Sequence, residues 1–222
     1  MANYYLNYLN DCGNNLPLPV TNYLYSRGVE YPQKYNIKYS VGLLKKPNYP
    51  WDIFNNGIDK FTGYILIPVF DEYAEVVGII GRNFFKNNLP KYMLSLSEHF
   101  VEKGHIYGLD RVLPHVMNKD IKPVILTEGW FDWLVLTRVY KHVLCTFTCN
   151  VNQRQQAVLK RYFDKFYIAF DNDEEKYGLK AAQYLSRRLN AEIRLPQFKD
   201  WNQMYTSLGS AKFDEEIKKI FV

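Results

Sequence analysis

The part of the sequence that most limits the possible folds lies after residue 120, where apolar runs alternate with helix-like segments. Apolar runs at residues 124–126, 142–147, 166–170 and 192–195 predict four strands. Segments near 130–140, 153–163 and 178–190 lie between them and predict three helices, the second with Asn152 as its N-cap. This alternation is typical of an α/β fold whose parallel strands are joined by crossover helices.

Acidic side chains follow three of the four predicted strands, where each strand ends. Glu128 follows the first strand, Asp171 and Asp173 follow the third, and Asp200 follows the fourth. Ligands of open parallel sheets bind outside the carboxyl ends of the strands, so these four acids are expected at one edge of the sheet. Asp132 lies one helical turn after Glu128 and can face the same way. The sequence therefore predicts a cluster of carboxylates.

Carboxylates that converge in this way repel one another, and a hard cation relieves that repulsion. Oxygen ligands suit Mg²⁺ or Mn²⁺. Asp171 and Asp173 are two apart on an extended segment and can clasp one ion. Glu128 is placed to act as a general base or as a ligand to a second ion, an arrangement that supports phosphoryl transfer. Taken alone, an Asp-x-Asp after a strand more often caps the next helix, so the pattern of both motifs together carries the prediction.

Composition excludes several classes of protein. No run of about 18 apolar residues is present to span a membrane, and the start MANYYLNYLNDCGNN lacks the features of a signal peptide. Three cysteines, Cys12, Cys145 and Cys149, are too few for a disulfide framework and fit a reducing compartment such as the cytoplasm. No second Cys or His pair stands near Cys145 and Cys149, so no zinc site is expected. The net charge of +5 permits a nucleic-acid partner without requiring one.

Residues 124–201 resemble a Toprim domain, which occurs in bacterial-type DNA primases, in type IA and type II topoisomerases and in some nucleases. Glu128-Gly129 after an apolar strand is similar to the first motif of that domain, and Asp171-Asn172-Asp173 is similar to the second. The resemblance implies a Toprim-type parallel sheet with flanking helices over residues 119–204. A smaller α+β subdomain with a basic surface would precede it over 1–118, and a short helix would follow at 205–222.

The upstream sequence resembles bacterial-type (DnaG-like) primases in particular. Residues 61–85 predict a β-hairpin around the polar turn 71-DEYAE-75, and 64-YILIPVFDEYAEVVGIIGR-82 is similar to a hairpin of that family. The rest of the resemblance lies in 24-LYSRGVE-30 with 37-IKYSVGL-43, and in 90-PKYMLSLSEHFVEKGHIYGLDRV-112, 128-EGWFD-132 and 196-PQFKDWNQM-204. The resemblance covers about residues 20–205. Topoisomerases and nucleases do not carry the Lys-Tyr, Lys-Gly, Tyr-Gly-Leu series that lies within residues 90–112.

The resemblance implies a nucleotidyltransferase that synthesises short RNA primers on single-stranded DNA for replication. Two or three Mg²⁺ or Mn²⁺ ions would be bound by Glu128, Asp132, Asp171, Asp173 and Asp200, of which Glu128, Asp171 and Asp173 would be catalytic. The basic surface for template and nucleotides would include Lys60, Arg82, Lys91 and Lys103. The implied partners are the DNA template, ribonucleoside triphosphates, and a replicative helicase or a zinc-binding template-recognition protein acting in trans.

The chain departs from the family's pattern at several positions. The stretch 60-KFTGY-64 keeps Lys60 but has Thr62 and Tyr64 where arginines are expected, which puts template or nucleotide affinity in doubt. The gap between Asp173 and Gly178 is longer than usual, and Asn202 stands where a second acid is frequent. No zinc module precedes the core, which is the pattern of a phage- or plasmid-encoded primase.

Two other functions stay open from the sequence. A Toprim nuclease would use the same metal geometry with water in place of the hydroxyl group, although the upstream basic series argues against it. A degenerate core that only binds DNA or a replication partner is favoured by the missing arginines and opposed by the complete set of acids.

Overall fold

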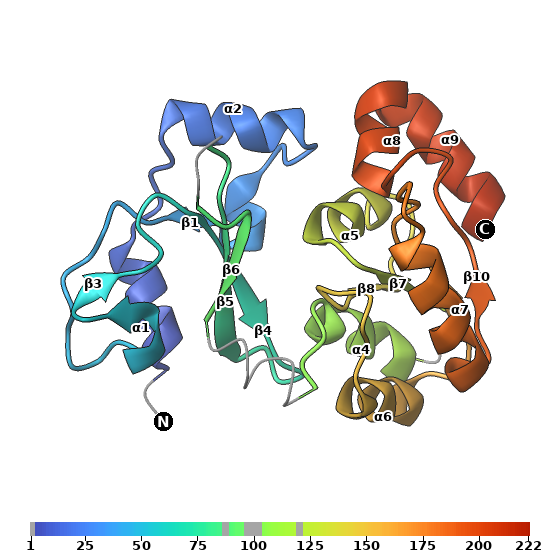
Figure 1. Cartoon of the computed structure of the whole chain (residues 1–222), viewed down its shortest axis with the longest axis horizontal. Helices are drawn as coiled ribbons and strands as arrows, with labels where there is room; N and C mark the ends of the chain where they lie inside the picture. The colour runs from blue at the N-terminus through green and yellow to red at the C-terminus, as the bar shows by residue number, and fades with distance from the viewer. Residues whose placement is uncertain (1–2, 86–88, 96–103, 119–121) are drawn as a thin grey trace. The chain divides into compact units, whose positions relative to one another are not determined.

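The protein is described by a computed structural model that covers residues 3–85, 89–95, 104–118 and 122–222 (Figure 1). It forms two compact units, Met1–Val101 and Glu102–Val222. The sequence placed this boundary later, between residues 118 and 119. The difference arises because helix α4 (Leu109–Met117) buries Leu109, Val112 and Leu113 in the core of the second unit.

The first unit is built around the predicted hairpin. Strand β4 (Ile65–Phe70) pairs antiparallel with β5 (Val76–Arg82), and Asp71 closes the turn by accepting hydrogen bonds from the backbone N–H groups of Tyr73 and Glu75. Strands β1 (Lys38–Tyr39) and β6 (Tyr92–Leu94) extend the sheet in the order β1-β4-β5-β6. The remaining described elements are α1 (Tyr4–Asp11), α2 (Leu18–Ser26), η1 (Pro32–Tyr35), η2 (Trp51–Ile53), β2 (Phe54–Asn55) and β3 (Ile58–Asp59).

A buried carboxylate organises one side of this unit. Asp59 is 4% exposed, and its side chain accepts hydrogen bonds from the hydroxyl groups of Tyr8 and Ser40 and from the backbone N–H groups of Leu43 and Phe61. These bonds join helix α1 to the loops on both sides of β2 and β3. The buried charge is therefore satisfied by four donors from separate segments.

Replacing Asp59 by asparagine should lower the free energy of unfolding by about 2 kcal/mol, because the amide group cannot accept from all four buried donors. Urea unfolding followed by circular dichroism measures the change. Glu72→Gln, an exposed substitution in the same unit, serves as the matched control. A loss of stability no larger than that of the control would contradict this role.

The second unit contains the predicted parallel sheet. Its strands are β7 (Val124–Thr127), β8 (Val143–Cys145), β9 (Phe166–Ile168) and β10 (Glu192–Ile193), in the order β10-β9-β7-β8, and all three pairings are parallel. Helices α5 (Trp130–Leu136), α6 (Gln153–Tyr162) and α7 (Tyr177–Leu189) connect them. The α/β fold predicted from the alternation of strands and helices is confirmed.

Alternating strand residues face two layers of helices. Apolar residues of α4, α6 and α7 pack with Leu126, Leu144 and Ile168 in one core. On the other face, helices α8 (Trp201–Leu208) and α9 (Ser210–Phe221) follow α5, and the ring of Phe221 contacts those of Tyr167 and Trp201. No described helix is both long and apolar enough to cross a membrane.

Candidate metal site and basic residues

The pairing of β7 with β9 decides where the acids emerge. Leu126 of β7 lies opposite Ile168 of β9 in a parallel pair, so both strands end at the same edge of the sheet. Glu128 follows the first strand and Asp171 follows the second. Asp132 lies in the first turn of α5, directly after Glu128. Three of the predicted acids are thus carried to this edge by neighbouring elements of the second unit.

Asp171 lies at the electrostatic centre of this edge. Burial raises the pKa of its carboxyl group to about 8, with further increases from the negative charges of Asp132, Glu128, Asp200 and Asp173. Its Oδ1 atom is buried and has no hydrogen-bond partner in the described part of the chain. A buried, unpartnered carboxylate oxygen surrounded by like charges is unfavourable unless a proton or a cation is added.

Glu128 and Asp132 are held close to the backbone. Burial raises the pKa of Glu128, and the charge of Asp173 raises it further. Asp132 is 5% exposed, and its Oδ1 accepts a hydrogen bond of 2.9 Å from the backbone N–H of Asn202. Gly129 makes this possible, because a Cβ atom there would overlap Oδ2 of Asp132. The Glu-Gly pair therefore combines an acid with a residue that leaves room for the next acid.

Asp173 and Asp200 are oriented by helix N-termini. The side chain of Asp173 accepts hydrogen bonds from the backbone N–H groups of Tyr177 (2.9 Å) and Gly178 (3.1 Å), and the bond from Gly178 is the main cause of its lowered pKa. Asp200 is the N-cap of α8 and accepts from the N–H of Gln203 at 2.6 Å. Both carboxylates thus perform the capping role that a lone acid before a helix usually has.

The acids do not form a closed cluster as they stand. Within the part of the chain that the structure describes, no three His, Cys, Asp or Glu side chains lie close enough together to hold a metal ion. The predicted clasp of one ion by Asp171 and Asp173 is therefore not preformed, because Asp173 turns toward the start of α7. Each carboxylate oxygen still has a second lone pair available to a cation.

The residues at this edge nevertheless fit a divalent metal. The donors are all oxygen atoms, which suits Mg²⁺ and Mn²⁺. The unpartnered Oδ1 of Asp171 is the atom that most requires a cation, and the pKa of that carboxyl group is raised by the same neighbours that would share the ion. Asp171 and Glu128 are the primary candidate ligands, and Asp132, Asp173 and Asp200 surround them.

Two supporting residues were not identified from the sequence as part of the site. A Cβ atom at Gly178 would overlap the backbone carbonyl oxygen of Asp171, so the first turn of α7 packs directly on the segment that carries Asp171. Asn202 stands at a position where an acidic residue is frequent, and its backbone N–H positions Asp132. A glycine in the first turn of a helix, where alanine would stabilise the helix more, is the one signal that could have pointed to Gly178.

Three of the predicted basic residues, Lys60, Arg82 and Lys91, belong to the first unit and differ in their environments. Arg82 is 7% exposed, donates a hydrogen bond to the hydroxyl group of Tyr23, and lies 4.5 Å from the ring centre of Tyr92. Lys60 is half-buried, which lowers its pKa. Lys91 is exposed beside Tyr92. Lys103 lies outside the described residues.

Known proteins with this sequence pattern and fold were identified in three comparisons. A family described as Toprim-like matches residues 125–205. A DNA primase of Mycoplasma genitalium is 28% identical over 167 residues, which is 71% of this chain and 26% of that protein. The chain spans between 18% and 32% of the length of three such curated primases.

Solved primase structures have the same fold. The Aquifex aeolicus primase, with its zinc-binding and RNA polymerase domains, superposes with a TM-score of 0.72 at 22% identity, over 92% of this chain and 55% of that one. A DnaG primase catalytic domain bound to single-stranded DNA superposes with a TM-score of 0.70 at 16% identity, over 96% of this chain and 77% of that one. The chain therefore contains a Toprim-like region at residues 125–205, is similar in sequence to bacterial DNA primases, and has the fold of solved primase catalytic cores.

Proposed function

We propose that this chain is the catalytic core of a DNA primase that synthesises short RNA primers on single-stranded DNA. The observation that carries the proposal is the unpartnered Oδ1 of Asp171 among four further carboxylates at the carboxyl edge of the sheet. The similar solved core that binds single-stranded DNA supports the choice of template. A nucleotidyltransferase activity follows from this proposal.

The chemistry would be phosphoryl transfer from a ribonucleoside triphosphate. Bound Mg²⁺ would neutralise charge on the phosphates as it develops. Asp171 and Glu128 would hold the ions, while Asp132, Asp173 and Asp200 would fix the shape of the site through their backbone hydrogen bonds. Glu128, whose pKa is raised by burial, is the candidate to accept the proton of the attacking 3′ hydroxyl group. The oxygen of that group would bond to the α-phosphorus as pyrophosphate leaves.

The basic residues would contribute unequally. Lys91 is exposed beside the ring of Tyr92, whereas Arg82 is enclosed by the rings of Tyr23 and Tyr92. We assign direct phosphate contacts to Lys91 and Lys103. Arg82 would also contact a phosphate group, from the position in which the rings of Tyr23 and Tyr92 hold its side chain. Lys60 would act from its half-buried position beside the backbone carbonyl of Leu94. A helicase or a template-recognition protein would act as a separate partner.

A priming assay tests the proposed function. The full chain is incubated with single-stranded DNA, labelled ribonucleoside triphosphates and Mg²⁺ or Mn²⁺, beside Asp171→Ala and the exposed control Asp164→Asn. Short labelled RNA made by the unsubstituted chain and the control, and absent with Asp171→Ala, is the expected result. Shortened template DNA without labelled products would assign the site to a nuclease. DNA binding with neither product would show a core without catalysis.

A further inference from the structure

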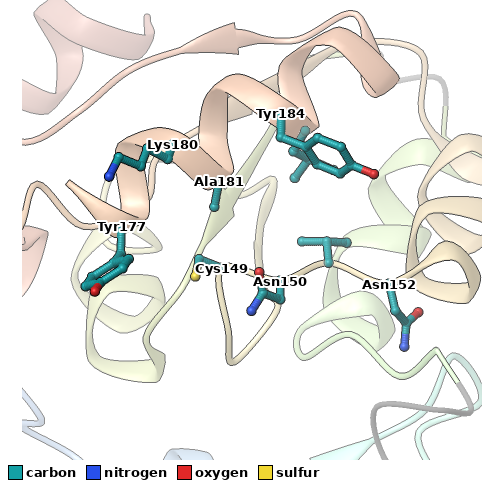
Figure 2. A pocket seen from close by; sticks show the side chains of 9 residues that line it. Cys149, Asn150, Asn152, Tyr177, Lys180, Ala181 and Tyr184 are labelled. Atoms are coloured by element: carbon teal, nitrogen blue, oxygen red, sulfur yellow. The ribbon is translucent and has the colours of Figure 1, made fainter. Parts of the chain in front are cut away.

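The second unit contains a pocket that the proposed chemistry does not use. It has a volume of about 640 Å³ and lies between the loop at residues 149–152 and helix α7. This volume is within the range of sites that hold small organic groups. Figure 2 shows Ala181 of α7 facing Cys149 and Asn150 across the pocket, with Tyr177 and Tyr184 toward its two ends. The small side chain of Ala181 leaves the space between the two rings open.

Helix α7 carries an aromatic and basic stripe that lines this pocket from Tyr177 to Tyr184 and continues past it to Arg188. Tyr177, Lys180, Tyr184 and Arg188 recur at helical spacing on one face. The two tyrosines are 63% and 57% exposed. Lys180 Nζ lies 5.8 Å from the ring centre of Tyr177, and Arg188 Cζ lies 4.6 Å from that of Tyr184. Each exposed ring is thus paired with an exposed cation.

The stripe begins beside the carboxylates. The backbone N–H of Tyr177, the first residue of the stripe, donates a hydrogen bond to Asp173. Cys149 lies in the pocket wall, and its pKa is raised by burial and then by the charges of Glu128 and Asp173. A ligand along the stripe would therefore have one end next to the candidate metal site and the other end at Arg188.

The chemistry and the length of the stripe identify the class of ligand. Aromatic faces stack with unpaired bases, and neighbouring cations contact phosphate groups. The helix rises about 16 Å from Tyr177 to Arg188, which exceeds the length of a single nucleotide and suits several consecutive ones. We propose that the pocket and stripe bind single-stranded DNA, with a base between Tyr177 and Tyr184 and phosphates at Lys180 and Arg188. This proposal rests on the proposed function for the identity of the strand.

Binding of a fluorescent ten-residue oligothymidylate to the full chain tests the proposal. The measurement is fluorescence anisotropy in EDTA, so that metal binding and catalysis do not contribute. Tyr184→Ala is expected to weaken binding about tenfold, and Tyr184→Phe to retain it. Ala181→Leu, which fills the pocket without removing a contact, is expected to weaken binding similarly. Arg188→Gln should reduce the dependence of affinity on salt by about one ion.

Tyr73→Ala is the matched control, because Tyr73 is 80% exposed in the first unit. An unchanged affinity of Tyr184→Ala and Ala181→Leu, or an equal loss in Tyr73→Ala, would overturn the proposal. Tighter binding of an RNA of the same length, with the same dependence on Tyr184, would overturn the assignment to DNA. Displacement of the oligonucleotide by micromolar thymidine triphosphate would assign the pocket to a free nucleotide instead. Because binding is measured in EDTA and priming requires a metal ion, this proposal and the proposed function can fail independently of each other.

Discussion

Asp171→Asn is expected to abolish primer synthesis and, in the absence of metal, to stabilise the protein. Synthesis should fall by about a hundredfold or more, because the substitution removes the negative charge that would hold a cation at the unpartnered oxygen. The same change removes a buried negative charge that Asp132 and Glu128 repel. The melting temperature of the metal-free chain should therefore rise by about 3 °C or more at pH 8.5.

The gain in stability should depend on pH in a defined direction. The pKa of Asp171 is about 8 in the folded chain, above its ordinary value of about 4 in an unfolded chain. The folded state therefore holds the proton between these values, and the associated stability is present below pH 4 and lost as the pH rises through 8. Asp171→Asn should melt close to the unsubstituted chain at pH 5 and above it at pH 8.5.

Thermal melting in EDTA at the two pH values measures this effect, with Asp164→Asn as the control for loss of an exposed acid. Equal melting temperatures of Asp171→Asn and the unsubstituted chain at pH 8.5 would show that the charge of Asp171 does not destabilise the metal-free fold. Retained priming by Asp171→Asn would remove this residue from the reaction.

Gly178→Ala is expected to reduce primer synthesis by about a hundredfold although it touches no substrate. A Cβ atom at position 178 would overlap the backbone carbonyl oxygen of Asp171, so either α7 or the segment after β9 must move. A displacement of about 1 Å is enough for a loss of this size in a site that depends on positioning. Overpacking of this kind should also lower stability by about 1 to 3 kcal/mol.

Gly209→Ala separates the two effects. Gly209 lies between α8 and α9 with φ of +75°, and nothing lies within 4 Å of a Cβ atom placed there. That substitution strains the backbone and lowers stability by about 1 kcal/mol, yet it leaves Asp171 in place. Priming by Gly178→Ala at the level of Gly209→Ala would show that the contact with Asp171 is not needed.

Local patterns in the sequence predicted most of the architecture. The polar turn after Phe70 and the apolar runs beside it predicted the hairpin of β4 and β5, because a turn of that composition leaves few alternatives. Asn152 was predicted as the N-cap of α6, and its side chain accepts from the backbone N–H of Gln155 as part of a capping box. The boundary between the units was placed too late, because a short helix such as α4 does not reveal in sequence which core it joins.

The candidate site was only partly predictable. The order of strands and acids placed Glu128, Asp132 and Asp171 at one edge, since parallel topology fixes which strand ends meet. Asp173 and Asp200 are oriented by backbone N–H groups at helix starts that have no partner within the helix. Which N–H groups these are depends on where α7 and α8 begin. The longer segment before Gly178 sets the start of α7, and Trp201 is the first residue of α8. The role of Gly178 depends on a contact with Asp171 that no local pattern encodes.

Direct measurement of Mn²⁺ binding tests the central claim, that the carboxylates at the sheet edge form a divalent metal site around Asp171. Electron paramagnetic resonance of free Mn²⁺, titrated with the full chain at pH 7.5, gives the number of bound ions and their affinity. The account predicts bound Mn²⁺ that Mg²⁺ displaces, retained in Asp164→Asn and lost in Asp171→Asn. Equal Mn²⁺ binding by Asp171→Asn and the unsubstituted chain would contradict it.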